Sequence, residues 1–219
     1  VPRVCLQAAH LLPAHLSALW SCLAEDSREA RRLQHLDIRE VDMEDSGCPA
    51  TLARAVLSLT SARLPPYSQT RLLLTSLSAA PSSPPCSLRH LELEGATTAT
   101  MRSVPPEVLA RAVARLDHFH LSLTSYIDPA AFPVQEEVLL GEEWYYSDSS
   151  TLGQPSLGPL LQQVVQEGVL QELVLEEVDL SSTAAFLLVG AVLQLRKLVL
   201  RGANLGEQQT TQLFANLVS

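Results

Sequence analysis

Histidine and carboxylate side chains recur at matching places near the middle of the chain, and these residues are the best suited to chemistry. His90 precedes Glu92 and Glu94 at alternate positions, and His118 and His120 are likewise two residues apart. Imidazole and carboxylate groups bind transition-metal ions, and imidazole also changes its charge near about pH 6. If the two segments are neighbouring parallel strands, His90 lies about 5 Å from His118. Metal binding and pH sensing are open interpretations, but polar residues are expected at such positions in any sheet, so we assign no metal site.

Catalytic motifs are missing from the sequence. It contains no Gly-x-Ser-x-Gly elbow, no glycine loop that cradles phosphate, no metalloprotease helix and no local Cys-His pair. The four cysteines (Cys5, Cys22, Cys48 and Cys86) are far apart and form no Cys-x-x-Cys pair, which favours free thiols in a reducing compartment. The sequence therefore predicts no enzyme, no catalytic residue and no cofactor.

The charge balance narrows the choice of partner. The chain has 15 basic and 24 acidic residues and a net charge of −9, which opposes binding to nucleic acids and to anionic membrane surfaces. The longest apolar run, residues 183–195, is too short to span a bilayer, and no signal peptide is found. We expect a cytoplasmic protein whose partner is a basic or mixed-charge polypeptide.

A repeated pattern of apolar residues predicts the strands that would position these side chains. Two segments that begin at Leu170 and Leu195 have apolar residues at relative positions 1, 4, 6, 9 and 11. Alternation at positions 4 and 6 is typical of a strand, and residues with helical spacing fill the interval between the copies. The pattern predicts a repeating unit of one strand and one helix.

The same pattern predicts a single domain over residues 1–219 with seven or eight repeats. The expected repeats start at residues 1, 33, 69, 88, 116, 135, 170 and 195. Two of them are degenerate and lie in the irregular stretches 61–87 and 127–155. The copy at 69 has Leu72 and Leu74 as strand residues and a Pro-Ser connector in place of a helix, and the copy at 135 has Val138 and Leu140. Identical Leu-Ala-Arg-Ala-Val pentapeptides at residues 52 and 109 lie about two repeat lengths apart.

These units resemble the ribonuclease-inhibitor-like subtype of leucine-rich repeats, most closely at residues 33–56, 88–126 and 170–218. The resemblance implies an α/β solenoid bent into a horseshoe, with short parallel strands on the concave face and helices on the convex face. It also implies that proteins are recognised on the concave sheet, and it implies no chemistry. The chain departs from the family at the ninth position, where Asn or Cys is usual. The residues found there are Ala9, Val41, Ala96, Thr124, Val178 and Ala203.

Strand periodicity selects the residues of the concave face. Positions 1, 4 and 6 of each unit point into the core, so positions 3, 5 and 7 point outward. The face is basic at both ends and acidic and histidine-rich between them, which suits a basic or mixed-charge polypeptide. The expected binding residues are His35, Asp37, Arg39, His90, Glu92, Glu94, His118, His120, Glu172, Glu176, Lys197 and Arg201.

Three adjacent aromatic residues, Trp144, Tyr145 and Tyr146, stand among acidic residues in the second irregular stretch. Aromatic side chains carry much binding energy with few rotatable bonds, which is typical of an interaction anchor. They would equally well fill the gap left by an irregular repeat. Both interpretations are open.

The ends of the chain lack the polar outer face of capping repeats. We therefore expect residues 1–219 to be a segment of a longer protein, packed on the remainder of its own chain or covered by partners. The sequence favours a protein-interaction module that binds a polypeptide on its concave face. The alternative is a structural or assembly subunit that packs through its uncapped ends, including the apolar helices at residues 16–23 and 213–217.

Overall fold

Strands and helices alternate along the chain. The computed structural model describes residues 3–7, 13–24, 33–39, 49–65, 70–79, 87–124 and 156–218. The strands are β1 (Arg3–Gln7), β2 (His35–Arg39), β3 (Ser61–Leu64), β4 (His90–Thr97), β5 (His118–Thr124), β6 (Glu172–Glu176) and β7 (Lys197–Arg201). The helices are α1 (Pro13–Ala24), α2 (Pro49–Ser58), α3 (Thr70–Ala79), α4 (Thr98–Arg102), α5 (Pro106–Val113), α6 (Gly158–Glu167), α7 (Ala185–Gln194) and α8 (Glu207–Val218).

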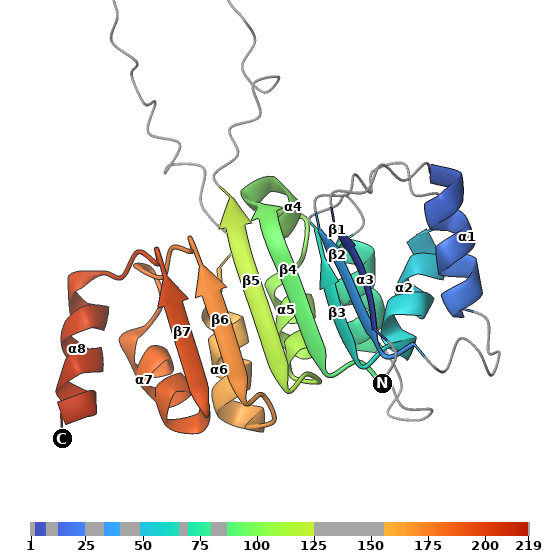
Figure 1. The fold of residues 1–219 in the computed structure, drawn as a ribbon. Helices are drawn as coiled ribbons and strands as arrows, with labels where there is room; N and C mark the ends of the chain where they lie inside the picture. Colours follow the sequence, from blue (N-terminus) through green and yellow to red (C-terminus); the bar gives the residue numbers. More distant parts are fainter. Residues whose placement is uncertain are drawn as a thin grey trace, which may run out of the picture.

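The seven described strands form one parallel sheet whose strand order is the order of the sequence (Figure 1). The described helices form a second layer behind this sheet, and neighbouring helices pack against each other. The expectation of an α/β fold with short parallel strands joined by helices is confirmed. None of the described helices combines the length and the apolar content needed to cross a membrane.

The hydrophobic core lies between the sheet and the helices and is almost entirely aliphatic. One row of core side chains crosses the sheet in register and includes Leu36, Ala62, Leu91, Phe119 and Leu173, all fully buried. Burial of each large side chain contributes about 1.5–3 kcal/mol relative to leaving it in water. Because the apolar residues alternate along each strand, the polar residues between them all face the opposite side of the sheet.

Local sequence explains where several helices begin and end. Pro105 and Pro106 open α5, since proline fits the first helical turn, whose N–H groups have no partner within the helix. Gly168 ends α6 with a φ of 63°, a left-handed conformation that costs glycine little. Gly190 lies within α7, where a Cβ atom would come within 2.9 Å of Val165 on α6. Glycine at this position therefore permits the close approach of these two helices.

The structure corrects the expected repeat at residue 69. Leu72 and Leu74 are not strand residues, because α3 covers this stretch with Leu74 in the core and Leu72 at the surface. The strand of this unit is β3, in which Ala62 pairs with Leu36 on one side and Leu91 on the other. Residues 70–79 are thus the helix that the sequence interpretation left out.

Within the described sheet, β5 and β6 are direct neighbours, which bears on the second degenerate repeat. These two strands pair directly, with His118 opposite Glu172 although 54 residues separate them in the sequence. The sheet therefore has no place between them for the strand expected at Val138 and Leu140, and those two residues lie outside the described part of the chain. The next described helix after β5 is α6, which packs against α5 and α7.

Candidate functional site

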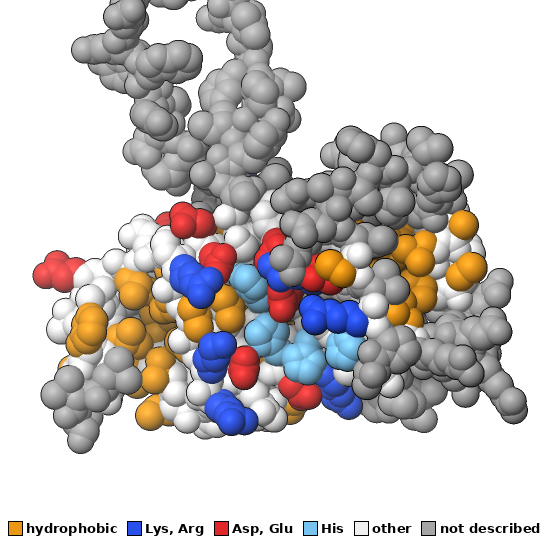
Figure 2. All heavy atoms as spheres, viewed as in Figure 1, with side chains coloured by type: hydrophobic (Ala, Val, Ile, Leu, Met, Phe, Trp, Pro, Cys, Tyr) orange, Lys and Arg blue, Asp and Glu red, His pale blue; other side chains and the backbone are white. Residues whose placement is uncertain are grey.

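The face of the sheet that no described helix covers, here called the open face, carries the polar side chains of the strands. Histidines gather at its middle, with arginine, lysine and acidic side chains around them (Figure 2). On β4, for example, Leu91 and Leu93 are buried in the core whereas Glu92 between them lies on the open face. The strand register thus places side chains from distant parts of the sequence next to each other.

Three rows of residues cross the middle of the open face. The first row is His90, His118, Glu172 and Lys197. The second row includes Arg63, Glu92 and His120. The third row is Ser122, Glu176 and Arg201. We define the His–Glu cluster as His118, His120, Glu92, Glu172 and Glu176, which occupy adjacent places in these rows.

His118 lies between two carboxylates that come from the strands on either side of it. Its Nδ1 atom is 3.2 Å from Oε2 of Glu172 on β6, and its Nε2 atom is 3.9 Å from Oε1 of Glu92 on β4. The ring also lies beside that of His90, with 5.8 Å between the ring centroids. The two nitrogen atoms of His118 therefore face two different acids.

His120 repeats this arrangement one step further along β5. Its Nδ1 atom is 3.8 Å from Oε2 of Glu92, and its Nε2 atom is 3.5 Å from Oε1 of Glu176. The Nε2 atom is buried and makes no hydrogen bond within the described residues. Glu92 is thus shared by the two histidines, and each histidine has one further carboxylate of its own.

Basic side chains surround the His–Glu cluster on both sides. Arg63 forms an ion pair with Glu92, at 3.3 Å from Nε, and with Glu94. Lys197 Nζ is 3.7 Å from Glu172, and Arg201 donates a 2.8 Å hydrogen bond to Glu176. Lys197 and Arg201 are exposed, so their pairs contribute only about 0–1 kcal/mol each and serve mainly to fix the positions of the carboxylates.

Sequence interpretation missed Arg63 because it missed β3. The signal was present, since Leu59, Ala62 and Leu64 occupy the first, fourth and sixth positions of the repeat pattern. Arg63 is then the fifth position of that unit and belongs to the open face. It supplies the positive charge nearest to Glu92.

The charges around two carboxylates lower their pKa values. The His120 side chain holds the pKa of Glu92 below its usual value, and the charges of Arg63 and His118 lower it further, although burial opposes them. Burial acts to raise the pKa of Glu176, but the hydrogen bond from Arg201 and the charge of His120 outweigh it and lower the pKa. Both side chains are therefore ionised at neutral pH.

Three side chains of this region approach each other closely enough to suggest a metal site. One ligand atom each from Glu92, Glu94 and His120 lies within 4.8 Å of the others. The guanidinium group of Arg63, however, already pairs with both carboxylates. Because a metal ion would have to displace this positive charge, we assign these residues to an ion-pair network.

The remaining expected residues lie apart from the His–Glu cluster or outside the described part of the chain. Asp37 and His35 are on β2, two strands from Glu92. Asp37 lies opposite Arg63 in the second row, is buried and forms an ion pair with Arg3 at 3.8 Å. Arg39 ends β2, opposite Gln7 of β1. The aromatic residues at 144–146 lie outside the described residues.

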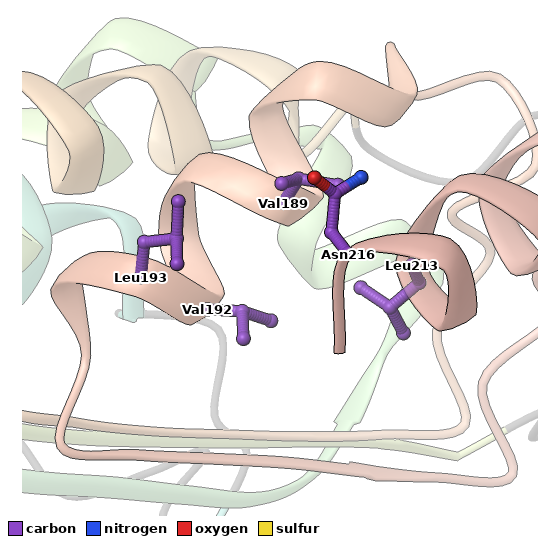
Figure 3. Close-up of a pocket in the computed structure, with 5 residues that line it drawn as sticks. All are labelled: Val189, Val192, Leu193, Leu213 and Asn216. Atoms are coloured by element: carbon purple, nitrogen blue, oxygen red, sulfur yellow. The ribbon is translucent and has the colours of Figure 1, made fainter. Parts of the chain in front are cut away.

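A shallow apolar groove lies at the other face of the molecule, between α7 and α8 (Figure 3). Its lining residues are Val189, Val192 and Leu193 of α7 and Leu213 and Asn216 of α8. No acid, base or nucleophile lines this groove, and within the described residues it is separate from the His–Glu cluster. The charged side chains of the described residues thus gather on the open face and not in this groove.

Comparison with known proteins adds no assignment, since no family model matches the chain and no curated protein matches it. The function must therefore be inferred from the residues themselves.

Proposed function

We propose that the chain is a leucine-rich-repeat solenoid that binds a polypeptide on the open face of its sheet. The observation that carries the proposal is the band of charged side chains across β3 to β7, which no described element covers. The period of the apolar pattern and the parallel strand order support the repeat assignment. No enzymatic activity and no cofactor form part of this proposal.

The arrangement of charge suits a basic or mixed-charge partner. The carboxylates of Glu92, Glu172 and Glu176 lie in the middle of the band, and Lys197 and Arg201 flank them. Complementary charges fix the register of a bound chain and speed its association. Because a packed sheet holds these side chains in place, the partner should bind with little rearrangement of the protein.

Paired variants with equal changes in net charge test the proposal. The open-face variant carries Glu172→Gln and Glu176→Gln, and the control carries Glu107→Gln and Glu167→Gln on exposed positions of α5 and α6. Quantitative affinity capture identifies candidate partners, and calorimetric titration of each purified partner then gives its affinity. We expect the open-face variant to bind about tenfold more weakly, which corresponds to about 1.4 kcal/mol. Equal affinity for both variants, or a loss confined to the control, would contradict the proposal.

A second candidate function is assembly through the surface formed by α7 and α8. Three large apolar side chains are mostly exposed there: Phe186 at 70%, Leu193 at 75% and Phe214 at 61%. When α5 and α7 are aligned from their first residues, charged residues of α5, Glu107 and Arg111, correspond to Phe186 and Gly190 of α7. The surface of α7 is therefore the more apolar of the two. Exposed apolar patches of this kind mark interaction surfaces.

Sedimentation velocity distinguishes this second candidate. If the protein self-associates through this end, Leu193→Gln with Phe214→Gln should yield monomers at concentrations where the wild type is oligomeric. The matched control is Leu72→Gln with Val169→Gln, which removes two exposed apolar residues elsewhere. A monomeric wild type, or dissociation caused by the control, would exclude assembly of copies through α7 and α8.

A further inference from the structure

Each histidine of the His–Glu cluster presents both of its ring nitrogens to carboxylates. His118 faces Glu172 with Nδ1 at 3.2 Å and Glu92 with Nε2 at 3.9 Å. His120 faces Glu92 with Nδ1 at 3.8 Å and Glu176 with Nε2 at 3.5 Å. The four contacts involve three carboxylates, because Glu92 lies against both rings.

The protonation state of the rings decides whether these contacts are attractive. A neutral imidazole has one N–H donor, and its second nitrogen carries a lone pair that accepts hydrogen bonds. That lone pair would face a carboxylate oxygen, which is also an acceptor, so one of the two contacts of each ring is repulsive. A protonated imidazolium donates from both nitrogens and satisfies both carboxylates. The buried Nε2 atom of His120, which makes no hydrogen bond, is the position where this second donor is needed.

The charges that face the two rings come from four strands. They are Arg63 on β3, His90, Glu92 and Glu94 on β4, Glu172 and Glu176 on β6, and Lys197 and Arg201 on β7. With all histidines neutral, the four carboxylates and three cations of this group leave a net charge of −1. Protonation of His118 and His120 makes it +1, so two protons reverse the sign of the local charge.

We propose that His118 and His120 form a proton-operated switch that sets the charge of the open face. Histidine changes its charge between about pH 5 and 8, so the switch operates within the physiological range. At the upper end of this range the open face is acidic and attracts a cationic polypeptide. At the lower end the carboxylates are neutralised by the rings, and a cationic polypeptide is released. This regulatory role rests on the function proposed above.

Nitrogen-15 spectroscopy of the histidine rings tests the switch without any partner. Between pH 8 and pH 5.5 both rings should change from a single neutral tautomer to the doubly protonated form. Substitution of the shared carboxylate, Glu92→Gln, should move both transitions to lower pH. Glu172→Gln should move only that of His118, and Glu176→Gln only that of His120. His35→Gln is the control and should move neither.

If one variant fails to fold, each of the other two still tests its own expected shift: both rings for Glu92→Gln, His118 alone for Glu172→Gln and His120 alone for Glu176→Gln. A ring that stays neutral at pH 5.5 would overturn the switch. If Glu172→Gln and Glu176→Gln each shifted the protonation transitions of both rings equally, the switch would also be overturned. Such a result would reflect the change in total charge and not the individual contacts.

Binding of decalysine at low ionic strength tests the regulatory role. Wild-type protein should bind decalysine about fivefold or more weakly at pH 5.5 than at pH 7.5. A variant with His118→Gln and His120→Gln should lose most of this difference, although its other histidines are unchanged. The same pH dependence in both proteins would overturn the regulatory role. Decalysine binding at pH 7.5 that is unaffected by Glu172→Gln with Glu176→Gln would instead contradict the proposed function.

Discussion

Glu92 is the residue at which the charges of the open face converge, since Arg63, His118 and His120 all lie within 3.9 Å of its carboxylate. Its pKa is lowered in the folded protein, first by His120 and then by the neighbouring charges. A carboxylate with a lowered pKa contributes stability above its usual pKa of about 4.3, and this contribution is lost as the pH falls through the folded value.

The lowered pKa of Glu92 predicts how its removal changes stability at different pH values. Glu92→Gln should lower the free energy of unfolding at pH 7 by up to about 1 kcal/mol, and the difference from wild type should shrink toward zero as the pH falls below about 4. Urea denaturation at pH 7 and at about pH 3 measures both values. The exposed Glu107→Gln on α5 is the control. A difference of equal size at the two pH values would show that Glu92 acts through packing and not through its charge.

The sequence alone identified most of the residues of the candidate site. The alternation of Leu91, Glu92 and Leu93 was enough to assign Glu92 to the open face, because strand periodicity fixes the side of each residue. The sequence did not predict the contacts between strands. Which carboxylate faces which nitrogen of His118 depends on the register of β4, β5 and β6, which the structure supplies.

At the scale of elements, α7 approaches α6 closely at Gly190. Alanine normally stabilises a helix interior by about 1 kcal/mol relative to glycine, but its Cβ atom would lie 2.9 Å from Cγ2 of Val165. We predict that Gly190→Ala gives no gain in stability in the wild type and gains about 1 kcal/mol when Val165→Ala provides space. Urea denaturation of the four proteins of this cycle measures the coupling. An equal gain in both backgrounds would contradict the close contact.

Gln209 joins α8 to the segment that precedes α7. Its buried amide donates hydrogen bonds to the carbonyl oxygens of Ser181, at 2.8 Å, and Thr183, at 2.6 Å. Gln209→Leu removes both donors, and unsatisfied buried acceptors cost about 1–3 kcal/mol. We expect a loss of this size in urea denaturation, whereas Gln208→Leu on the exposed side of α8 should leave stability nearly unchanged. Similar losses for both variants would mean that Gln209 does not hold α8 in place.

The elements that sequence misjudged are those with weak or ambiguous patterns. β3 has a small residue, Ala62, where the other described strands have larger apolar residues, so its apolar signal is weak. In α3, Leu72 and Leu74 alternate as in a strand, although Leu73, Leu74 and Leu77 are the residues that face the core. Short apolar runs fit the helical period as well as the strand period, and packing against the neighbouring elements decides which structure forms.

At the scale of the whole molecule, each described strand contacts mainly the preceding and following strands, and the helices likewise contact mainly other helices. The inner strands β4 and β5 have fully buried core residues, whereas Leu198 and Leu200 of the edge strand β7 are only partly buried. Local opening should therefore start at the edge, and hydrogen exchange of β7 amides should be at least about tenfold faster than that of β5 amides. Exchange followed by mass spectrometry measures this ratio. Uniform protection across the sheet would indicate that the molecule opens only as a whole.

The pairing of β5 with β6 has a consequence for how the chain folds. Strands joined by short connections can add to a growing sheet one after another, with little entropy lost at each step. His118 and Glu172, however, are 54 residues apart, about twice the usual separation of paired strands, and each doubling of a loop costs about 0.6 kcal/mol more to close. Pairing of β5 with β6 should therefore be the slowest strand addition in the described sheet, by roughly threefold, because its closure costs about 0.6 kcal/mol more than the others.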